Sequence, residues 1–256
     1  MLFRSWPAVA GTGPVFAPGL PVLACLAAGY LVDVHRGKAD PSDHLGGVLY
    51  VLQWPVIPAG PLLRATDFRH QLWRADLTMA GFSYGVRRVV QGLTKVYLVA
   101  GPLGSTADQI FALRVTKLSV DAAWLGAVCG PLATYFFLSG FTDIGIGLGK
   151  MIGFRYQENF RRPFTADSVH EFWRCWNVTL ATWLRDYLGL PAAGHLHPTL
   201  RRVLLTTAGF VIVGAWIQPS VGVLAWALYF AVWLAAEAIW FERVLVRAPQ
   251  IGRAHV

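Results

Sequence analysis

The residues best suited to chemistry lie between His170 and Pro191, in a segment that reads HEFWRCWNVTLATWLRDYLGLP. Three tryptophans, two arginines and two acidic residues surround one asparagine, Asn177. The amide of an asparagine can donate a hydrogen bond to negative charge that develops on a carbonyl oxygen. It cannot take up a proton as a general base, for which histidine is the usual residue. The segment therefore suggests a polar site in which Asn177 is a hydrogen-bond donor.

The spacing of this segment predicts one amphipathic helix. Ser168 and Glu171 have the pattern of a capping box at its start, and Gly189 with Pro191 ends it. Aromatic and aliphatic residues recur at helical spacing on one broad face: Trp173, Trp176, Leu180, Trp183, Leu184 and Tyr187. Such a helix is typical of the membrane interface, where aromatic rings lie at headgroup depth. A pure anchoring role is the alternative to a functional one.

Other polar side chains have plainer expected roles. We expect Arg185 and Asp186 to pair with each other or to bind lipid headgroups, while the tryptophans either wall a tunnel or stack on neighbouring helices. Asp143 lies at the end of an apolar stretch, where a carboxylate is costly in lipid, so it is expected to face the protein interior or water. Cys175 has no neighbouring base and is expected to be a packing residue.

The elements that must position these residues are apolar helices. Only 14% of the 256 residues are charged, against about 25% in a typical soluble domain. Aspartate, glutamate, lysine and arginine are absent from four blocks: Ser5–Val32, Leu45–Leu63, Ala122–Thr142 and Val203–Ala236. Roughly 20 apolar residues cross a bilayer core, and a backbone in lipid must satisfy its own hydrogen bonds. The sequence therefore predicts an all-α, polytopic integral membrane protein, a multi-helix bundle with interfacial and broken or re-entrant helices.

The apolar segments are not equivalent. The second is interrupted by three prolines between Pro55 and Pro61, which predicts a broken or re-entrant helix. The segment Phe82–Leu103 carries Arg87 and Arg88 on the side of Lys95, which indicates a wet or protein-covered face. The expected segments are, in chain order, Val15–Val32, Val48–Leu63, Phe82–Leu103, Ala122–Gly140, Val203–Trp216 and Val221–Trp240. We expect the first to be retained rather than cleaved as a signal peptide, because prolines interrupt it and no small-residue cleavage site is clear.

The net charge of +8 predicts membrane lipid as a partner, because lysine and arginine favour cytoplasmic loops and anionic headgroups. The basic residues lie between the apolar segments and form no continuous stripe, so nucleic acid is not expected. The three cysteines show no paired spacing, and neither a disulfide framework nor a metal site is expected.

Beyond these physical patterns, the segment from His170 resembles the signature of the membrane-bound O-acyltransferase family, in particular its bacterial branch that acetylates alginate and other exopolysaccharides. Three further stretches resemble family motifs and follow the family's order along nearly the whole chain. They read GYLVDVHRGK from Gly29, IPAGPLLRATDF from Ile57 and SGFTDIGIGLGKMIGFRYQENFRRPF from Ser139.

The resemblance implies the transfer of acetyl or acyl groups to polysaccharide hydroxyls outside the membrane. It implies an acyl thioester donor (acetyl-CoA or an acyl carrier) without a bound cofactor, exported acetylation partner proteins, and a multi-pass place in the bacterial inner membrane. The residues that it suggests as channel-lining or supporting are Glu171, Trp173, Arg174, Trp176, Trp183, Arg185, Asp186 and Asp143. We expect one acyltransferase-like domain over residues 1–256, N-terminally short relative to the family.

Two positions depart from the family pattern. Asn177 stands where the polysaccharide branch has its first catalytic histidine, and Ile217 stands where the family has the second. An amide and an aliphatic side chain supply no base, so the sequence predicts a degenerate or impaired acyltransferase. Two alternatives stay open. One is a working enzyme in which His170, His195 or His197 replaces the lost base. The other is a non-catalytic membrane subunit, or a transporter-like scaffold that passes substrate along the broken helix around Pro58.

Overall fold

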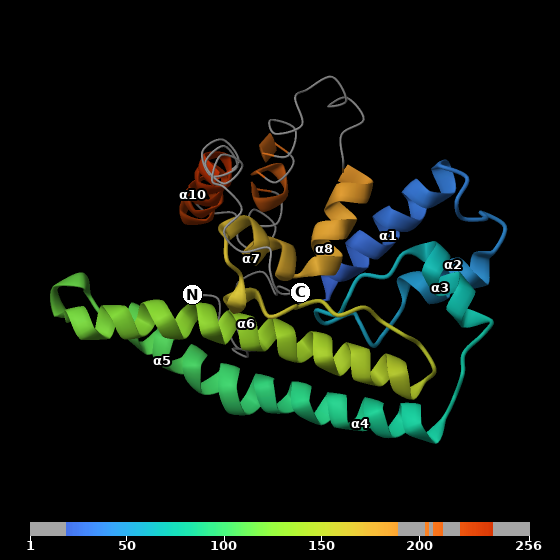
Figure 1. Ribbon diagram of the computed structural model, residues 1–256, viewed down its shortest axis with the longest axis horizontal. Coiled ribbons are helices and arrows are strands. Elements are labelled where there is room, and N and C mark those ends of the chain that lie inside the picture. Colours follow the sequence, from blue (N-terminus) through green and yellow to red (C-terminus); the bar gives the residue numbers. More distant parts are fainter. Residues whose placement is uncertain (1–18, 189–202, 205–206, 212–220, 238–256) are drawn as a thin grey trace, which may run out of the picture. The chain divides into compact units, whose positions relative to one another are not determined.

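The computed structural model describes residues 19–188, 203–204, 207–211 and 221–237, and every regular element within them is helical (Figure 1). The prediction of an all-α fold is confirmed for these residues. The chain divides into two compact units, Met1–Asn159 and Phe160–Val256, which are described separately. One domain over residues 1–256 stays a prediction. Ile217, His195, His197 and the chain before Gly19 lie outside the described residues.

The helices follow from local signals. In the first unit, Thr78 Oγ1 accepts a hydrogen bond from the Gly81 amide, and Ser119 Oγ accepts one from the Ala122 amide, so each caps the helix that follows it. The elements of this unit are α1 Leu20–His35, α2 His44–Val51, α3 Ala65–Leu72, α4 Met79–Leu93, η1 Thr94–Ala100, α5 Gly101–Phe111, η2 Val115–Lys117 and α6 Val120–Met151. The second unit contains η3 Pro163–Thr165, α7 Val169–Cys175, α8 Val178–Trp183, η4 Leu184–Leu188 and α10 Val221–Ala236.

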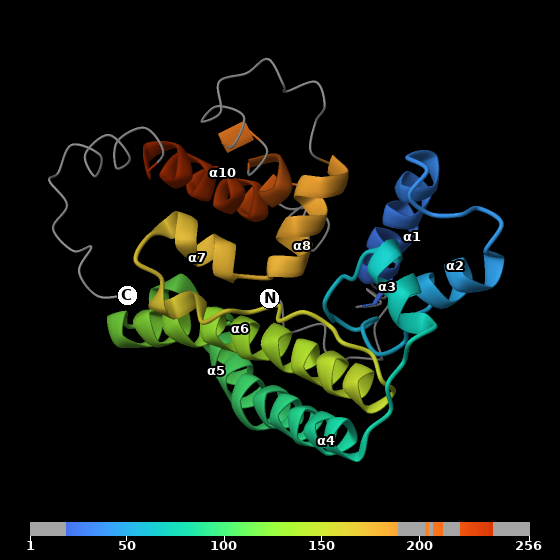
Figure 2. The same cartoon turned by 45° about the vertical axis from the view of Figure 1, so that its right-hand side comes forward.

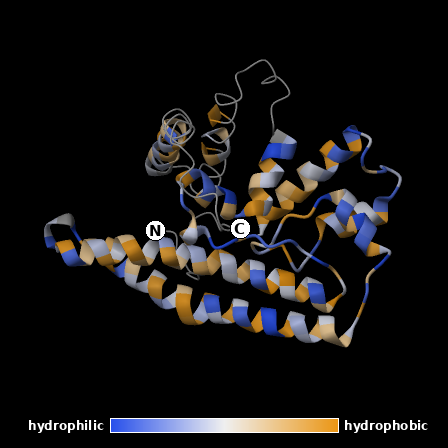
Figure 3. Ribbon diagram, in the orientation of Figure 1, coloured by the Kyte–Doolittle hydropathy of each residue, from blue (hydrophilic) through white to orange (hydrophobic). Residues whose placement is uncertain are grey.

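The long helix α6 is the described element that is long and apolar enough to cross a membrane. It contains the predicted span Ala122–Gly140 and continues through Asp143 to Met151, 32 residues in all. The elements α4, η1 and α5 follow one another without a break and lie alongside α6 in both views (Figure 1 and Figure 2). Figure 3 shows apolar residues along much of α6 and more hydrophilic residues on α4. Hydropathy therefore indicates a membrane span less clearly for α4 than for α6.

Glycines set the distance between α4 and α6. A β-carbon built on Gly85 would lie 2.5 Å from the carbonyl oxygen of Gly147, and one on Gly92 would lie 2.5 Å from that of Gly140. The converse approaches are equally short, at 2.6 Å for Gly147 and 2.8 Å for Gly140. The two backbones are therefore in contact at two levels of the helix pair. Small residues at such crossings are typical of helices that associate within membranes.

This contact gives a first prediction. Gly85→Ala is expected to lower the stability of the protein by about 1–3 kcal/mol, because the added methyl group meets a main-chain carbonyl that cannot move aside. The midpoint of thermal unfolding in detergent, followed by tryptophan fluorescence, measures the loss. Gly101→Ala is the matched control, because its nearest neighbouring atom would be 3.6 Å away and alanine favours the helix. Equal midpoints for the two variants would contradict close packing at Gly85.

The predicted segment Val48–Leu63 is interrupted, as expected from its prolines, but the part after α2 forms turns rather than a re-entrant helix. The helix ends at Val51, and the segment that contains Pro55 and Pro61 runs as turns until α3 begins at Ala65. Proline lacks the amide that a helix needs and clashes with the preceding turn, so three of them in close succession exclude a regular helix. Tyr50 anchors the stretch, because its hydroxyl donates a 2.8 Å hydrogen bond to the Leu63 carbonyl. The buried core around it consists of Leu26, Tyr50, Val56, Leu63, Ala65, Phe68 and Phe154.

Candidate functional site

The segment around Asn177 is broken where one continuous helix was predicted. Helix α7 ends at Cys175, Trp176 is extended, and Asn177 has φ 42° and ψ 57°, in the left-handed region, before α8 begins at Val178. The predicted helix from Ser168 to Gly189 is therefore wrong at this point. Its apolar spacing spans the break, because helical periodicity does not register a single change of backbone angle. Asparagine is one of the few residues that adopt this conformation readily, since its short polar side chain tolerates it.

The start of α7 is as predicted. Ser168 Oγ accepts a 3.0 Å hydrogen bond from the Glu171 amide. The Glu171 carboxylate pairs with Arg174 at 3.0 Å and accepts a bond from the Cys175 thiol at 3.5 Å. Partial burial and this carboxylate raise the pKa of the Cys175 thiol, which keeps it protonated and unreactive.

A further carboxylate holds α7 in the second unit. Glu237, which directly follows α10, accepts a 2.9 Å hydrogen bond from the amide of His170. Its only sequence signal is that it is the first charged residue after the apolar block that ends at Ala236. Sequence reasoning did not select it, because nothing local connects it to a helix so far back in the chain.

Trp173 and Trp176 pack against other rings. The Trp173 ring lies 4.4 Å from Phe210 and 5.0 Å from Phe230, centroid to centroid and nearly perpendicular to both. Trp176 stacks on Phe172 at 5.5 Å. These contacts realise the stacking alternative of the sequence analysis, since offset and edge-to-face pairs of this kind stabilise helix packing.

Trp183 and its neighbours have a different environment. Arg185 pairs with Asp186 at 3.2 Å, which confirms the predicted ion pair, although the Arg185 side chain is 67% exposed and such pairs contribute little stability. The Trp183 ring lies 5.2 Å from Tyr187. Its indole nitrogen, like that of Trp173, is buried and has no hydrogen-bond partner.

Asp143 is the centre of a charge cluster in the first unit. The residue is 4% exposed, which confirms that it faces the protein interior. Arg88 donates to its Oδ1 from Nε at 2.9 Å and from Nη2 at 2.8 Å, and Lys95 Nζ donates to Oδ2 at 2.6 Å. Lys95 also donates to Ser139 Oγ at 2.9 Å, and Arg88 pairs with Glu158. Arg87, which was predicted to share this side, is exposed.

The position of the cluster between the two glycine contacts matters. Asp143 lies between Gly140 and Gly147 in sequence, and Arg88 lies between Gly85 and Gly92. Because the backbones touch at both of these levels, the Asp143 carboxylate is buried between the helices, while Arg88 and Lys95 reach it from partly exposed positions. The cluster neutralises two cations on α4 and η1 that would otherwise be costly in lipid.

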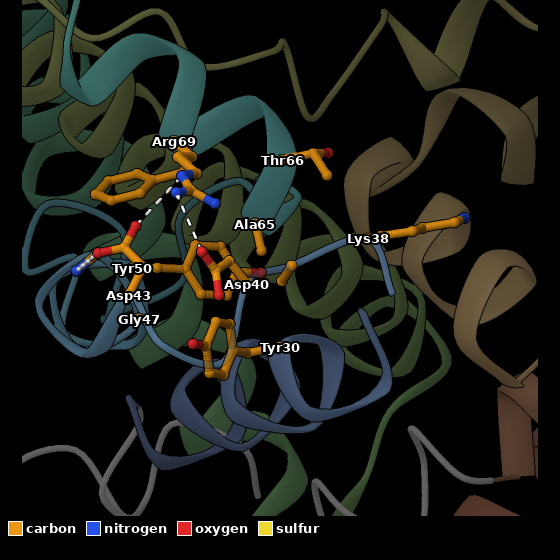
Figure 4. A pocket seen from close by; sticks show the side chains of 12 residues that line it. Tyr30, Lys38, Asp40, Asp43, Gly47, Tyr50, Ala65, Thr66 and Arg69 are labelled. Atoms are coloured by element: carbon orange, nitrogen blue, oxygen red, sulfur yellow. Dashed lines mark hydrogen bonds and ion pairs between the residues drawn. The ribbon is translucent and has the colours of Figure 1, made fainter. Parts of the chain in front are cut away.

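A small cavity in the first unit lies between the loop after α1 and helices α2 and α3 (Figure 4). Arg69 Nε lies 3.3 Å from Asp43, and its Nη2 lies 3.9 Å from Asp40. Hydrogen bonds from the hydroxyl and amide of Ser42 lower the pKa of Asp40, with a smaller contribution from Arg69. The carboxylates thus offset the charge of Arg69, so the polar side chains of Arg69, Asp40 and Asp43 beside the cavity are paired with one another. The described residues contain no group of three or more histidine, cysteine, aspartate or glutamate side chains that could hold a metal ion.

Comparison with known proteins gives a consistent result. The model of the membrane-bound O-acyltransferase family matches residues 44–252. A probable alginate O-acetylase of Pseudomonas fluorescens is 37% identical over 212 residues, which cover 81% of this chain and 42% of that protein. A peptidoglycan O-acetyltransferase of Helicobacter pylori is 28% identical over 77% of this chain and 38% of its own length. A teichoic acid D-alanyltransferase of Bacillus subtilis is 21% identical over 90% of this chain and 63% of its own length. The chain spans less than half the length of the alginate O-acetylase that it matches.

Proposed function

The chain belongs to the membrane-bound O-acyltransferase family, and we propose that it transfers acyl groups to hydroxyls of a bacterial cell-envelope polysaccharide, with impaired efficiency. The names of its relatives support this reaction class, since all three act on cell-surface polymers by acyl transfer. The higher identity to alginate O-acetylases favours acetyl groups and an exopolysaccharide of that type. The donor in this proposal is an acyl thioester, acetyl-CoA or an acyl carrier, and exported proteins of the same system act as partners.

The membrane arrangement in this proposal is multi-pass in the bacterial inner membrane. Helix α6 supplies one span, and the run from Met79 to Phe111 supplies another. At 1.5 Å per residue this run is about 50 Å long, which exceeds the roughly 30 Å of a hydrocarbon core. Asp143 and Glu158 offset the charges of Arg88 and Lys95, which lowers the cost of placing this run in lipid.

The chemistry and the backbone conformation of Asn177 are the main support for an impaired reaction. The resemblance of the signature segment suggests Asn177 as the catalytic position, and the residue is held in a left-handed conformation between two short helices. During acyl transfer the attacking hydroxyl must lose a proton while negative charge grows on the carbonyl oxygen. The Asn177 amide can donate a hydrogen bond to that oxygen, but it has no site that accepts the proton. In this proposal Asn177 therefore stabilises the developing charge but does not act as the general base.

A strain that lacks the gene tests this function directly. We expect its exopolysaccharide to carry less acetyl than that of the parent strain, measured after mild alkaline release of acetate. Re-expression of the intact chain should restore the content. Equal acetyl content in the parent and the deletion strain would contradict acyl transfer to that polymer.

A non-catalytic membrane subunit is the second candidate, and the packed turn around Gly60 favours it. A β-carbon on Gly60 would lie 2.4 Å from the Cα atom of Val56, so this turn has a defined shape that any larger residue disrupts. A scaffold role predicts that Gly60→Val abolishes acetylation while Asn177→Gly leaves it intact. An enzyme role predicts that both variants reduce it.

A further inference from the structure

The indole N–H of Trp183 is a buried donor without an acceptor. An indole nitrogen can only donate a hydrogen bond, so it selects for an acceptor atom. Buried donors are almost always paired in folded proteins, because leaving one without a partner forfeits the hydrogen bonds that water would have made. An orphaned N–H therefore indicates an acceptor that arrives from outside the chain.

Trp173 provides an internal comparison, because its indole nitrogen is also buried and without a hydrogen-bond partner. Two rings, Phe210 and Phe230, stand at 80° and 83° to it, with centroids at 4.4 Å and 5.0 Å. The face of a perpendicular ring is a weak acceptor for N–H groups. Within the described part of the chain, the ring next to Trp183 is Tyr187, which is inclined to it by only 37°. Perpendicular rings thus surround Trp173, whereas none lies beside Trp183 within the described residues.

The chain around Trp183 also has the features of a binding position. Trp183 is the last residue of α8, and the backbone passes directly into the π-helical turn η4. Turns of this kind inside helices occur frequently at functional sites. Thr179, one turn earlier on the same helix, is buried, so this face of α8 is covered by protein.

Charge near Trp183 defines the class of acceptor. The adjacent cation, Arg185, is paired with Asp186, so the two side chains together offer no net charge to a ligand. A phosphate or carboxylate would require a cation at this depth, whereas a neutral carbonyl oxygen would not. Among neutral acceptors, the one that the proposed acyl-transfer function supplies is the carbonyl oxygen of an ester or thioester.

We propose that the indole N–H of Trp183 donates a hydrogen bond to the carbonyl oxygen of the acyl group and thereby positions it. This inference rests on the proposed acyl-transfer function and assigns a specificity-determining residue to it. The assignment requires the nitrogen of the ring rather than its bulk. It therefore predicts discrimination between ligands with and without a carbonyl group.

The test compares binding of acetyl-CoA with that of S-ethyl-CoA, a thioether that lacks the carbonyl oxygen, to the chain in nanodiscs. We expect the native chain to prefer acetyl-CoA by about tenfold, which is the worth of one hydrogen bond. Replacing Trp183 by benzothienylalanine, in which sulfur takes the place of N–H, should remove the preference. The same replacement at Trp173 should retain it, and Trp183→Phe should behave as the benzothienylalanine variant does.

Three results would overturn the assignment: no preference in the native chain, a preference that persists after replacement at Trp183, or an equal weakening of both probes. An unchanged midpoint of thermal unfolding shows that a variant is folded. Acetyl transfer to polysaccharide is assayed separately. If transfer is absent while the carbonyl preference depends on Trp183, the proposed function fails and the binding assignment stands.

Discussion

Asp143→Ala is expected to lower the free energy of unfolding by about 3–5 kcal/mol, the usual loss when one partner of a buried ion pair is removed. The carboxylate accepts bonds from both Arg88 and Lys95, and it is itself buried between the two levels of glycine contact. Without it, two cations stay between α4 and α6 with no anion of comparable burial. We expect most of the variant to be lost from the folded fraction in detergent, as measured by size-exclusion chromatography and thermal unfolding.

Two further variants test whether the loss of stability comes from the buried carboxylate itself rather than from removing any charge of the cluster. Glu158 also pairs with Arg88, but its side chain is 46% exposed, so Glu158→Ala should cost no more than about 1 kcal/mol. Replacing Arg88, Lys95 and Asp143 together, as Arg88→Leu, Lys95→Met and Asp143→Leu, should recover much of the stability that Asp143→Ala loses, because no charge then stays unpaired between the helices and Glu158 is half-exposed. If Asp143→Ala lowered the free energy of unfolding no more than Glu158→Ala does, the charge cluster would not be what stabilises the pair of helices α4 and α6.

The largest expected gain of activity comes from restoring the absent base. The double variant Asn177→His and Ile217→His should raise the rate of acetyl transfer by about 100-fold or more, the usual contribution of a positioned general base. Histidine is among the residues that tolerate the left-handed conformation seen at Asn177, so the break between α7 and α8 should persist. Transfer of radiolabelled acetyl groups from acetyl-CoA to the isolated polymer measures the rate.

Substitutions at Asn177 alone distinguish its backbone from its amide. Asn177→Gly keeps the left-handed conformation and removes the amide, so it should lower transfer while leaving thermal stability nearly unchanged. Asn177→Val removes the amide and also disfavours the left-handed conformation, because a β-branched residue is strained at positive φ. It should therefore lower both the rate of transfer and the thermal stability. A double histidine variant with an unchanged rate, together with a fully active Asn177→Gly variant, would remove Asn177 from the site of acyl transfer.

Much of this protein follows from its sequence. The charge-free blocks predict apolar helices, and α6 is one of them. The prolines between Pro55 and Pro61 predict the interruption after α2, and Ser168 predicts the start of α7. The position of Asp143 at the end of an apolar stretch predicts that it turns inward. Each of these signals is local, because it depends on the cost of placing one residue type in one backbone conformation or one solvent.

The arrangement of the sites depends on the tertiary structure. The break at Asn177 is invisible to periodicity, because the same apolar residues repeat on both sides of it. Arg88, which pairs with Asp143, comes from another helix. The sequence does not show which glycines lie at the contact between the helices, because only the packed pair brings them together. The orphaned N–H of Trp183 is likewise a property of its surroundings. The sequence determines which side chains are too polar for lipid and which residues interrupt a helix. Packing determines the partners of those side chains, because the partners lie far along the chain and meet only when the helices associate.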